Sequence, residues 1–192
     1  QDGFLAPTGE GWKVEHDLGD TDAIAAGQKI KESQPATAVE VELVNRCGRH
    51  LAEVLRGEED PLELLFGSDA FSYTMALYHD TTTACIYNDL ITECIKRLEF
   101  GNTGHSPLRV LEIGAGTGGV TQAVMNGLEE RSYIYLSTDI SSGFVNAAKR
   151  RFEHLDNFNA TVLDIEKAPG QQGFDDTGFD LIIAANVVHA TA

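Results

Sequence analysis

A glycine-rich stretch lies in the second half of the chain, between a short apolar run and a helical pattern. Residues 112–119 read Glu-Ile-Gly-Ala-Gly-Thr-Gly-Gly, in which Gly114, Gly116 and Gly119 match a GxGxxG spacing. A strand-to-helix turn without Cβ atoms allows a nucleotide-containing cofactor to lie against the backbone at the carboxyl edge of a sheet. The same spacing also fits a tight turn that holds no ligand, so the flanking sequence has to discriminate between the two.

From residue 106 onwards, short apolar runs follow one another at the spacing of a parallel sheet. The spacers between the first three runs contain helical patterns, and this alternation is typical of right-handed βαβ units whose sheet is buried on both faces. The sequence therefore predicts an α/β, Rossmann-like core over residues 106–192. Its expected strands cover residues 108–113, 133–138, 160–163 and 179–185.

The first 105 residues have a different texture. Residues 1–35 mix Gly, Pro and acidic side chains without sustained periodicity, which favours a linker or a loosely packed extension. Residues 36–105 predict a helical subdomain that leads into the core. Its helices are expected at residues 36–56, 58–67 and 83–100.

The charge and the cysteines narrow the class of protein. Against 14 Lys and Arg stand 30 Asp and Glu, and a net charge of −16 repels nucleic-acid phosphates and anionic lipid. We therefore expect neither nucleic-acid nor membrane partners, although charge alone leaves a small RNA methyltransferase open. Cys47, Cys85 and Cys94 lack the spacing of metal ligands, so we expect no metal site and reduced thiols in a cytoplasmic protein. Cys85 and Cys94 are expected to pack in the core.

An acidic residue at each of two strand ends points to the cofactor. Asp139 follows the second apolar run, where its carboxylate can accept hydrogen bonds from both ribose hydroxyls of NAD or of S-adenosylmethionine. Glu112 separates these candidates, because a negative charge just before Gly114 suits the cationic amino-acid end of S-adenosylmethionine and serves no purpose beside a pyrophosphate. The sequence favours S-adenosylmethionine and keeps NAD as the alternative.

Longer stretches of the chain resemble a known family. VLEIGAGTGGVT, STDISSGFVNAAKRRFE, LDIEKAPGQQGF and FDLIIAANVVHAT resemble the carbon-methyltransferase (CMeT) domain of fungal highly reducing iterative type I polyketide synthases. LAEVLRGEEDPLELLF resembles the helical subdomain that precedes the cofactor fold in those enzymes, so the resemblance covers residues 39–191. It implies a class I S-adenosylmethionine-dependent methyltransferase fold, of which the chain would hold the N-terminal part of the sheet.

The resemblance also implies an activity and partners. The expected reaction is methylation of the α-carbon of a β-ketoacyl thioester, carried on the phosphopantetheine of an acyl carrier protein. Other domains of the same synthase, in a homodimeric parent, would be further partners. The non-methionine start and the apolar end at Ala192 suggest a piece of a longer protein, expected to be inactive alone.

The family pattern assigns roles to single residues. Asp139 would hold the ribose, and Asp164 with Ile165 would reach the adenine, while a solvated turn acid is the alternative for Asp164. Asn186 ends the fourth apolar run and is expected to line the site as well. The methionine end of the cofactor would be lined by Glu112, Gly114, Gly116 and Gly118.

His189, in an NxxHAT run, is the expected catalytic residue. In the resembling family this histidine is the general base, and a neutral imidazole with an ordinary pKa of about 6.5 can accept a proton near pH 7. The glutamate with which the family pairs it would come after Ala192. A satisfied structural histidine is the alternative. Histidines without such a context are His16, His50, His79, His105 and His154.

Two further functional classes stay open. A scaffold that keeps the fold without methylating is the main alternative, and the intact glycines, Asp139 and His189 argue against it. A free-standing methyltransferase or an NAD-binding domain would be expected to start with Met and to lack the helical lead.

Overall fold

The computed structural model describes residues 5–9, 11–15, 22–67, 70–100, 107–174 and 178–191. Residue contacts divide the chain into two units, residues 1–65 and residues 66–192, and each is considered by itself. None of the helices in these described ranges is long and apolar enough to cross a lipid bilayer.

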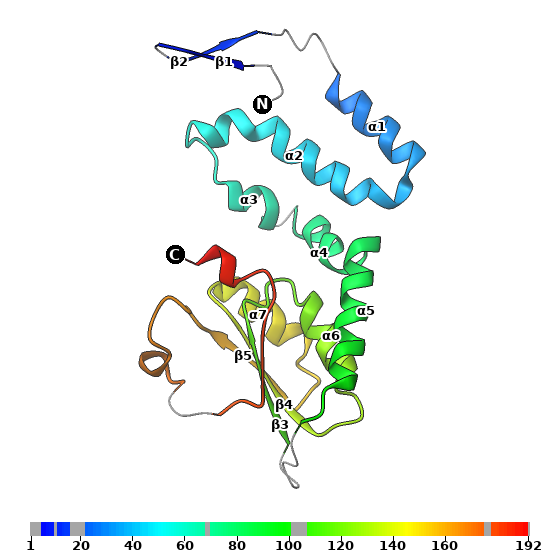
Figure 1. Ribbon diagram of the computed structural model, residues 1–192, viewed down its shortest axis with the longest axis vertical. Coiled ribbons are helices and arrows are strands. Elements are labelled where there is room, and N and C mark those ends of the chain that lie inside the picture. The colour runs from blue at the N-terminus through cyan, green and yellow to red at the C-terminus, as the bar shows by residue number, and fades with distance from the viewer. Residues whose placement is uncertain are drawn as a thin grey trace. The chain divides into compact units, whose positions relative to one another are not determined.

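The first unit begins with a small antiparallel hairpin and continues with helices (Figure 1). Strands β1 (Leu5–Thr8) and β2 (Gly11–Val14) pair with each other, and helix α1 (Ala23–Ser33) packs on α2 (Ala38–Leu55). Gly27 permits this packing, because a Cβ there would lie 2.9 Å from the Asn45 side chain. Helix α3 (Pro61–Phe66) follows and ends at the boundary between the units.

Residues 1–35 contain more regular structure than a linker or loose extension requires. Helix α1 begins where Oδ1 of Asp22 accepts hydrogen bonds from the amides of Ile24 and Ala25, at 3.1 and 3.0 Å. This N-cap satisfies backbone donors that an acidic, glycine-rich stretch would otherwise leave to water. The short hairpin and α1 were not expected from the sequence.

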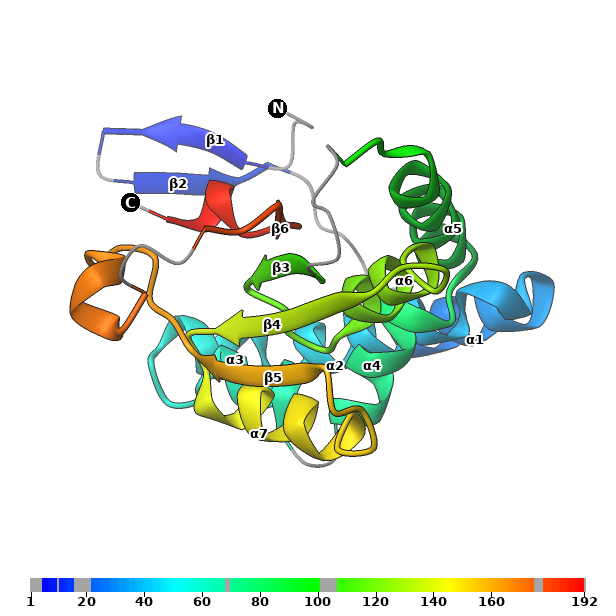
Figure 2. The same ribbon diagram turned by 90° about the horizontal axis from the view of Figure 1, so that it is seen from below.

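The second unit contains a parallel sheet with strand order β5-β4-β3-β6, as Figure 2 shows. The apolar runs read from the sequence all form strands, and the ends differ by a few residues. The strands are β3 (Leu108–Ile113), β4 (Tyr133–Asp139), β5 (Phe158–Val162) and β6 (Leu181–Ala184). The helices of this unit are α4 (Phe71–His79), α5 (Thr82–Arg97), α6 (Gly119–Gly127) and α7 (Ser142–Arg151). The short helices η2 (Pro169–Gln172) and η3 (Val188–Ala190) complete it.

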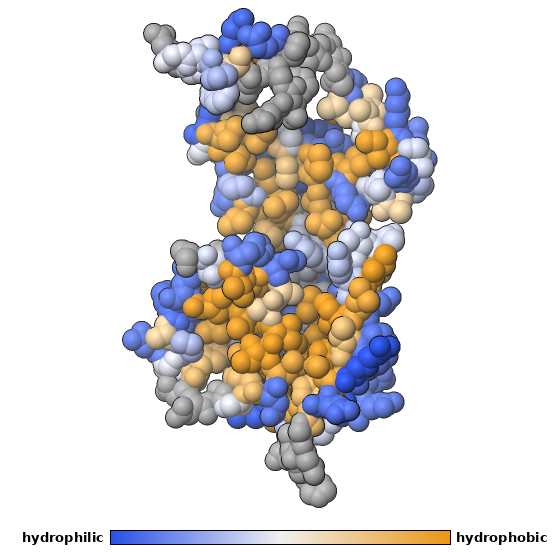
Figure 3. Space-filling model, viewed as in Figure 1, coloured by the Kyte–Doolittle hydropathy of each residue, from blue (hydrophilic) through white to orange (hydrophobic). Residues whose placement is uncertain are grey.

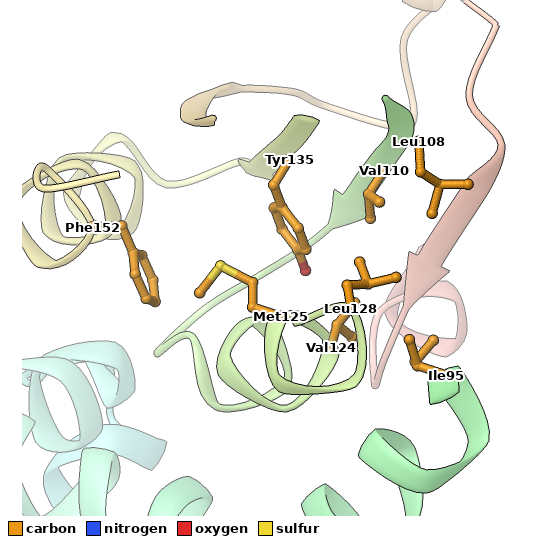
Figure 4. Close-up of a cluster of buried hydrophobic side chains, with 8 residues drawn as sticks. All are labelled: Ile95, Leu108, Val110, Val124, Met125, Leu128, Tyr135 and Phe152. Atoms are coloured by element: carbon orange, nitrogen blue, oxygen red, sulfur yellow. The ribbon is translucent and has the colours of Figure 1, made fainter. Parts of the chain in front are cut away.

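The core lies between one face of this sheet and the helices (Figure 4). Tyr135 of β4 is fully buried and stacks on Phe158 with ring centroids 5.7 Å apart. The other face is more open, since Ile134 is 49% exposed and Ile182 58% exposed. The prediction of a sheet buried on both faces is therefore wrong for the described residues, because both α6 and α7 contribute to the same side. The buried cluster consists of Ile95, Leu108, Val110, Val124, Met125, Leu128, Tyr135 and Phe152.

Several apolar side chains of the second unit are exposed, among them Ile86, Tyr87 and Leu90 of α5. Figure 3 shows a broad hydrophobic area on one face of this unit. Helix α5 directs Ile91 and Ile95 towards the core, while Cys85 and Cys94 of the same helix are exposed. Both thiols are exposed, so the prediction that they pack in the core is wrong.

Candidate cofactor site

The glycine turn connects the carboxyl end of β3 to the start of α6. Gly114, Gly116 and Gly118 have φ values of 65°, 52° and 78°, in the left-handed region that favours glycine. The amide of Ala115 donates to the Thr138 carbonyl at 2.9 Å and so ties the turn to the end of β4. The turn is thereby fixed at the edge where two central parallel strands end.

The glycines of this turn meet different surroundings. A Cβ at Gly114 would overlap the side chain of Val187, and one at Gly119 would lie 2.7 Å from the Tyr78 carbonyl oxygen. A Cβ at Gly116 would have no atom within 4 Å. Two glycines therefore permit close packing, whereas Gly116 faces open space.

Asp139 ends β4 directly behind this turn. It is 8% exposed, and its oxygens accept hydrogen bonds from the backbone amides of Gly116 and Ser141, each at 2.8 Å. Because each carboxylate oxygen has two lone pairs, the contacts among the described residues leave one on each oxygen for a ligand hydroxyl.

Glu112 is the most deeply buried acidic side chain of the site. It is 2% exposed, and its Oε2 accepts hydrogen bonds from Thr121 Oγ1 at 2.6 Å and from the Tyr135 hydroxyl at 2.9 Å. Burial raises the pKa of Glu112, the two hydrogen bonds lower it, and the negative charge of Asp139 raises it again. Burial and the neighbouring Glu112 raise the pKa of Tyr135 well above its ordinary value. A cation placed beside Glu112 would stabilise the charged carboxylate.

A cavity of about 590 Å³ opens over the turn, entirely within the second unit. One part of its wall is polar backbone and carboxylate, from Glu112, Gly114, Gly116 and Asn186. Asn186 itself has a positive φ of 55°. Other lining residues are aromatic or apolar, and include Phe66, Tyr78, Tyr87, Ile91 and Phe144.

The remaining predicted residues lie outside this lining. Gly118 is buried within the turn, and Asp139 stands behind Gly116. The carboxylate of Asp164 contacts Lys167 Nζ at 2.9 Å and accepts from the Glu166 amide, and its neighbour Ile165 is partly buried.

His189 is also outside the lining. It lies in η3, three residues after Asn186, with an exposed side chain. The structure thus brings Glu112, Gly114, Gly116 and Asn186 together around one cavity. His189 is close to Asn186 in the sequence but does not line the cavity.

Two side chains that contact the turn, His79 and Arg151, were not predicted from the sequence to belong to the site. His79 Nε2 lies 3.1 Å from the Thr117 carbonyl oxygen, and Arg151 Nη1 lies 3.2 Å from it. His79 is 38 positions from Thr117, and no local motif marks that contact. His50 instead pairs with Glu59 at 2.7 Å. His154 is exposed, and His16 and His105 lie outside the described residues.

Comparison with known proteins adds a family. A family model described as "Methyltransferase domain" matches residues 111–192. The chain is 35% identical over 161 residues to the hybrid PKS-NRPS synthetase apdA of Emericella nidulans. It is 39% identical over 170 residues to the highly reducing polyketide synthase gloL of Glarea lozoyensis. These matches cover 83% and 85% of the chain, but the chain spans only 4% and 6% of those two proteins.

Solved structures agree with this assignment. The CurJ carbon methyltransferase is 33% identical, with a TM-score of 0.87 over 99% of the chain and 50% of its own. The CMeT domain of the citrinin polyketide synthase is 28% identical, with a TM-score of 0.82 over 98% of the chain and 50% of its own. The trans-methyltransferase CalH, solved in complex with SAH, is 30% identical, with a TM-score of 0.67 over 91% of the chain and 48% of its own. The class I methyltransferase fold expected from the sequence is confirmed. With a parallel α/β sheet, a glycine turn at its carboxyl edge and these relatives, the chain belongs to the carbon-methyltransferase domains of polyketide synthases.

Proposed function

We propose that the chain uses S-adenosylmethionine to methylate the α-carbon of a β-ketoacyl thioester on an acyl carrier protein. The observation that carries this proposal is a single cavity lined by both polar and aromatic residues. Its lining combines Glu112 and the glycine turn with aromatic residues that include Tyr78, Tyr87 and Phe144. Such a cavity suits a charged cofactor beside an apolar acyl chain.

The residues around the turn fit S-adenosylmethionine. The volume of about 590 Å³ is in the range of small-molecule sites, and the open space at Gly116 allows a ligand to approach the backbone. The unused lone pairs of Asp139 suit two ribose hydroxyls, and Glu112 offers a negative charge to the ammonium of the methionine end. When bound, the cofactor supplies an electrophilic methyl group.

The hydrogen-bonding neighbours of Glu112 leave one of its carboxylate oxygens for the ammonium of the cofactor. Within the described residues, the hydrogen bonds from Thr121 and Tyr135 both arrive at Oε2, so Oε1 is the oxygen available to a ligand. A cation there lowers the raised pKa of Glu112, and cofactor binding therefore favours the ionised carboxylate.

For the remaining predicted residues the proposal rests on the family. Gly118 shapes the turn, and Asp164 with Ile165 is assigned to the adenine. The Asp164 carboxylate already forms an ion pair with Lys167. To contact the adenine, this carboxylate would have to leave Lys167, or neighbouring atoms would have to make the contact.

His189 is proposed as the general base. It would take a proton from the α-carbon of the β-ketoacyl thioester, and that carbon would then receive the methyl group, which leaves S-adenosylhomocysteine and a protonated His189. His189 follows Asn186, which lines the cavity, by three residues. Asn186 would contact the cofactor or the thioester from the same segment.

The partners belong to the same proposal. The relatives are polyketide synthases and PKS-NRPS hybrids, which supports an acyl carrier protein with a phosphopantetheine-bound chain and other domains of one synthase as partners. We further propose that the synthase that contains this chain is a homodimer and is located in the cytoplasm.

A second candidate is a scaffold that binds the cofactor without methylating. The exposed position of His189, outside the cavity lining, is the observation that favours it. The two candidates differ in turnover and not in cofactor affinity.

Calorimetry and a transfer assay separate these functions. Because the chain alone is expected to be inactive, the assay uses a polypeptide extended past Ala192. It is titrated with S-adenosylhomocysteine and with NAD, and is then incubated with S-adenosylmethionine and a β-ketoacyl pantetheine thioester for mass spectrometry. Binding of S-adenosylhomocysteine and methylation at the α-carbon support the proposal. Binding without transfer supports the scaffold, and preferential binding of NAD overturns both.

A further inference from the structure

The carbonyl of Thr117 is contacted by two side chains from two different helices. His79 Nε2, at the end of α4, lies 3.1 Å from the oxygen, and Arg151 Nη1, at the end of α7, lies 3.2 Å from it. The two nitrogen atoms are 3.3 Å from each other. Thr117 itself lines the cavity. A backbone group of the glycine turn is therefore held from two sides.

The end of α4 is fitted to this turn as well. The Tyr78 carbonyl oxygen lies so close to Gly119 that a Cβ there would be 2.7 Å away, and the same oxygen accepts a hydrogen bond from Asn88 Nδ2 at 3.2 Å. Tyr78 also lines the cavity. A shift of α4 would thus move both the turn and one wall of the cavity.

The charge of His79 decides how well this arrangement holds. With Nε2 protonated, the neutral ring donates to Thr117 beside the donor from Arg151; with Nε2 unprotonated, it accepts from Arg151. A charged imidazolium would stand 3.3 Å from a guanidinium. Burial lowers the pKa of His79 and the positive charge of Arg151 lowers it further, while the Thr117 carbonyl and the charge of Asp80 raise it.

We infer that His79 and Arg151 are positioning residues that clamp the Thr117 carbonyl and hold the cofactor-binding turn against α4, an arrangement that weakens when a protonated His79 stands beside Arg151. The inference rests on the proposed function for the identity of the ligand, S-adenosylhomocysteine in the test below. The clamp itself is a property of the protein without any ligand.

Three variants test the clamp by calorimetry with S-adenosylhomocysteine between pH 7.5 and pH 5.5. His79→Gln keeps a side-chain donor that does not titrate, His79→Phe removes it, and Arg151→Gln removes the neighbouring charge. His154→Gln is the control, because His154 is an exposed histidine a few residues beyond Arg151.

The wild-type protein and the control should lose affinity on acidification as His79 becomes protonated, by up to about fivefold, the size of one hydrogen bond. His79→Gln should bind as the wild type does at pH 7.5 and lose less at pH 5.5, and His79→Phe should bind about fivefold more weakly at both. In Arg151→Gln the loss should begin at higher pH, because the pKa of His79 is no longer lowered by that charge. Any pH dependence common to all variants belongs to Glu112 or another group.

Amide hydrogen exchange of residues 114–119 in the ligand-free protein is the second measurement. His79→Phe should exchange faster there than the wild type and the control. Equal exchange, together with an unchanged affinity and pH profile, would overturn the clamp. If the wild type binds no S-adenosylhomocysteine, the proposed function fails, and the exchange comparison alone decides on the clamp.

Discussion

Gly114→Ala and Gly116→Ala are a matched pair of substitutions for the glycine turn. Both residues have a positive φ, and a Cβ in the left-handed region costs about 1–2 kcal/mol at either position. At Gly114 alone the new methyl group would overlap Val187, and overpacking adds about 1–3 kcal/mol. We expect Gly116→Ala to lower the free energy of unfolding by about 1–2 kcal/mol and Gly114→Ala by about 2–5 kcal/mol.

Urea unfolding followed by circular dichroism measures this difference. Val187→Ala in the Gly114→Ala background removes the overlapping atoms, so the double variant should be more stable than Gly114→Ala alone, with a favourable coupling energy. In the Gly116→Ala background the same Val187→Ala change should show no coupling. Equal stabilities of the two alanine variants, or the absence of coupling with Val187, would refute the reasoning.

Three further substitutions address the cofactor and the base. Glu112→Gln should weaken S-adenosylhomocysteine by about 1.5–3 kcal/mol in calorimetry. Because burial raises the pKa of Glu112, the protonated side chain stabilises the fold below pH 4.5, and this stability is lost as the pH rises through the raised pKa. The Gln variant does not ionise, so its unfolding temperature should be higher than that of the wild type at about pH 8 but not at about pH 4. Asp139→Asn leaves one backbone amide without an acceptor and should cost about 1–3 kcal/mol of unfolding free energy, besides weakening S-adenosylhomocysteine. His189→Ala should slow methyl transfer about 10²–10⁴-fold in the thioester assay with cofactor affinity unchanged, and a variant that melts early yet turns over normally would mark a structural histidine.

The strands and the glycine turn could be predicted because their signals are local. Each apolar run of the sheet carries its own periodicity, and the run at 108–113 has the bounds of β3. A buried strand followed by glycines and a helix has few alternatives. The position of Glu112 and Asp139 at strand ends followed from the same reasoning, since parallel strands end at one edge.

The contacts that complete the site could not be predicted from one sequence. His79 and Thr117 are 38 positions apart, and Arg151 is 34 from Thr117, so their meeting depends on how α4 and α7 pack on the turn. The outward position of Cys85 depends on which side of α5 faces the core, and a mixed helix does not reveal this. Whether such a side chain is buried or exposed depends on how the helices pack and not on the residue type.

The glycines of this motif therefore have two different functions, ligand access and close packing, and the GxGxxG spacing does not show which glycine has which function. Gly116 is free to meet a ligand, whereas Gly114 and Gly119 are required because Val187 and the Tyr78 carbonyl occupy the space of a side chain. Val187 belongs to the segment between Asn186 and His189, and Tyr78 to the end of α4, so the small residues bring the polar and the aromatic walls close to one turn. A substitution at Gly114 or Gly119 should for that reason disturb the walls and the turn together. One at Gly116 should act on the ligand and on local strain alone.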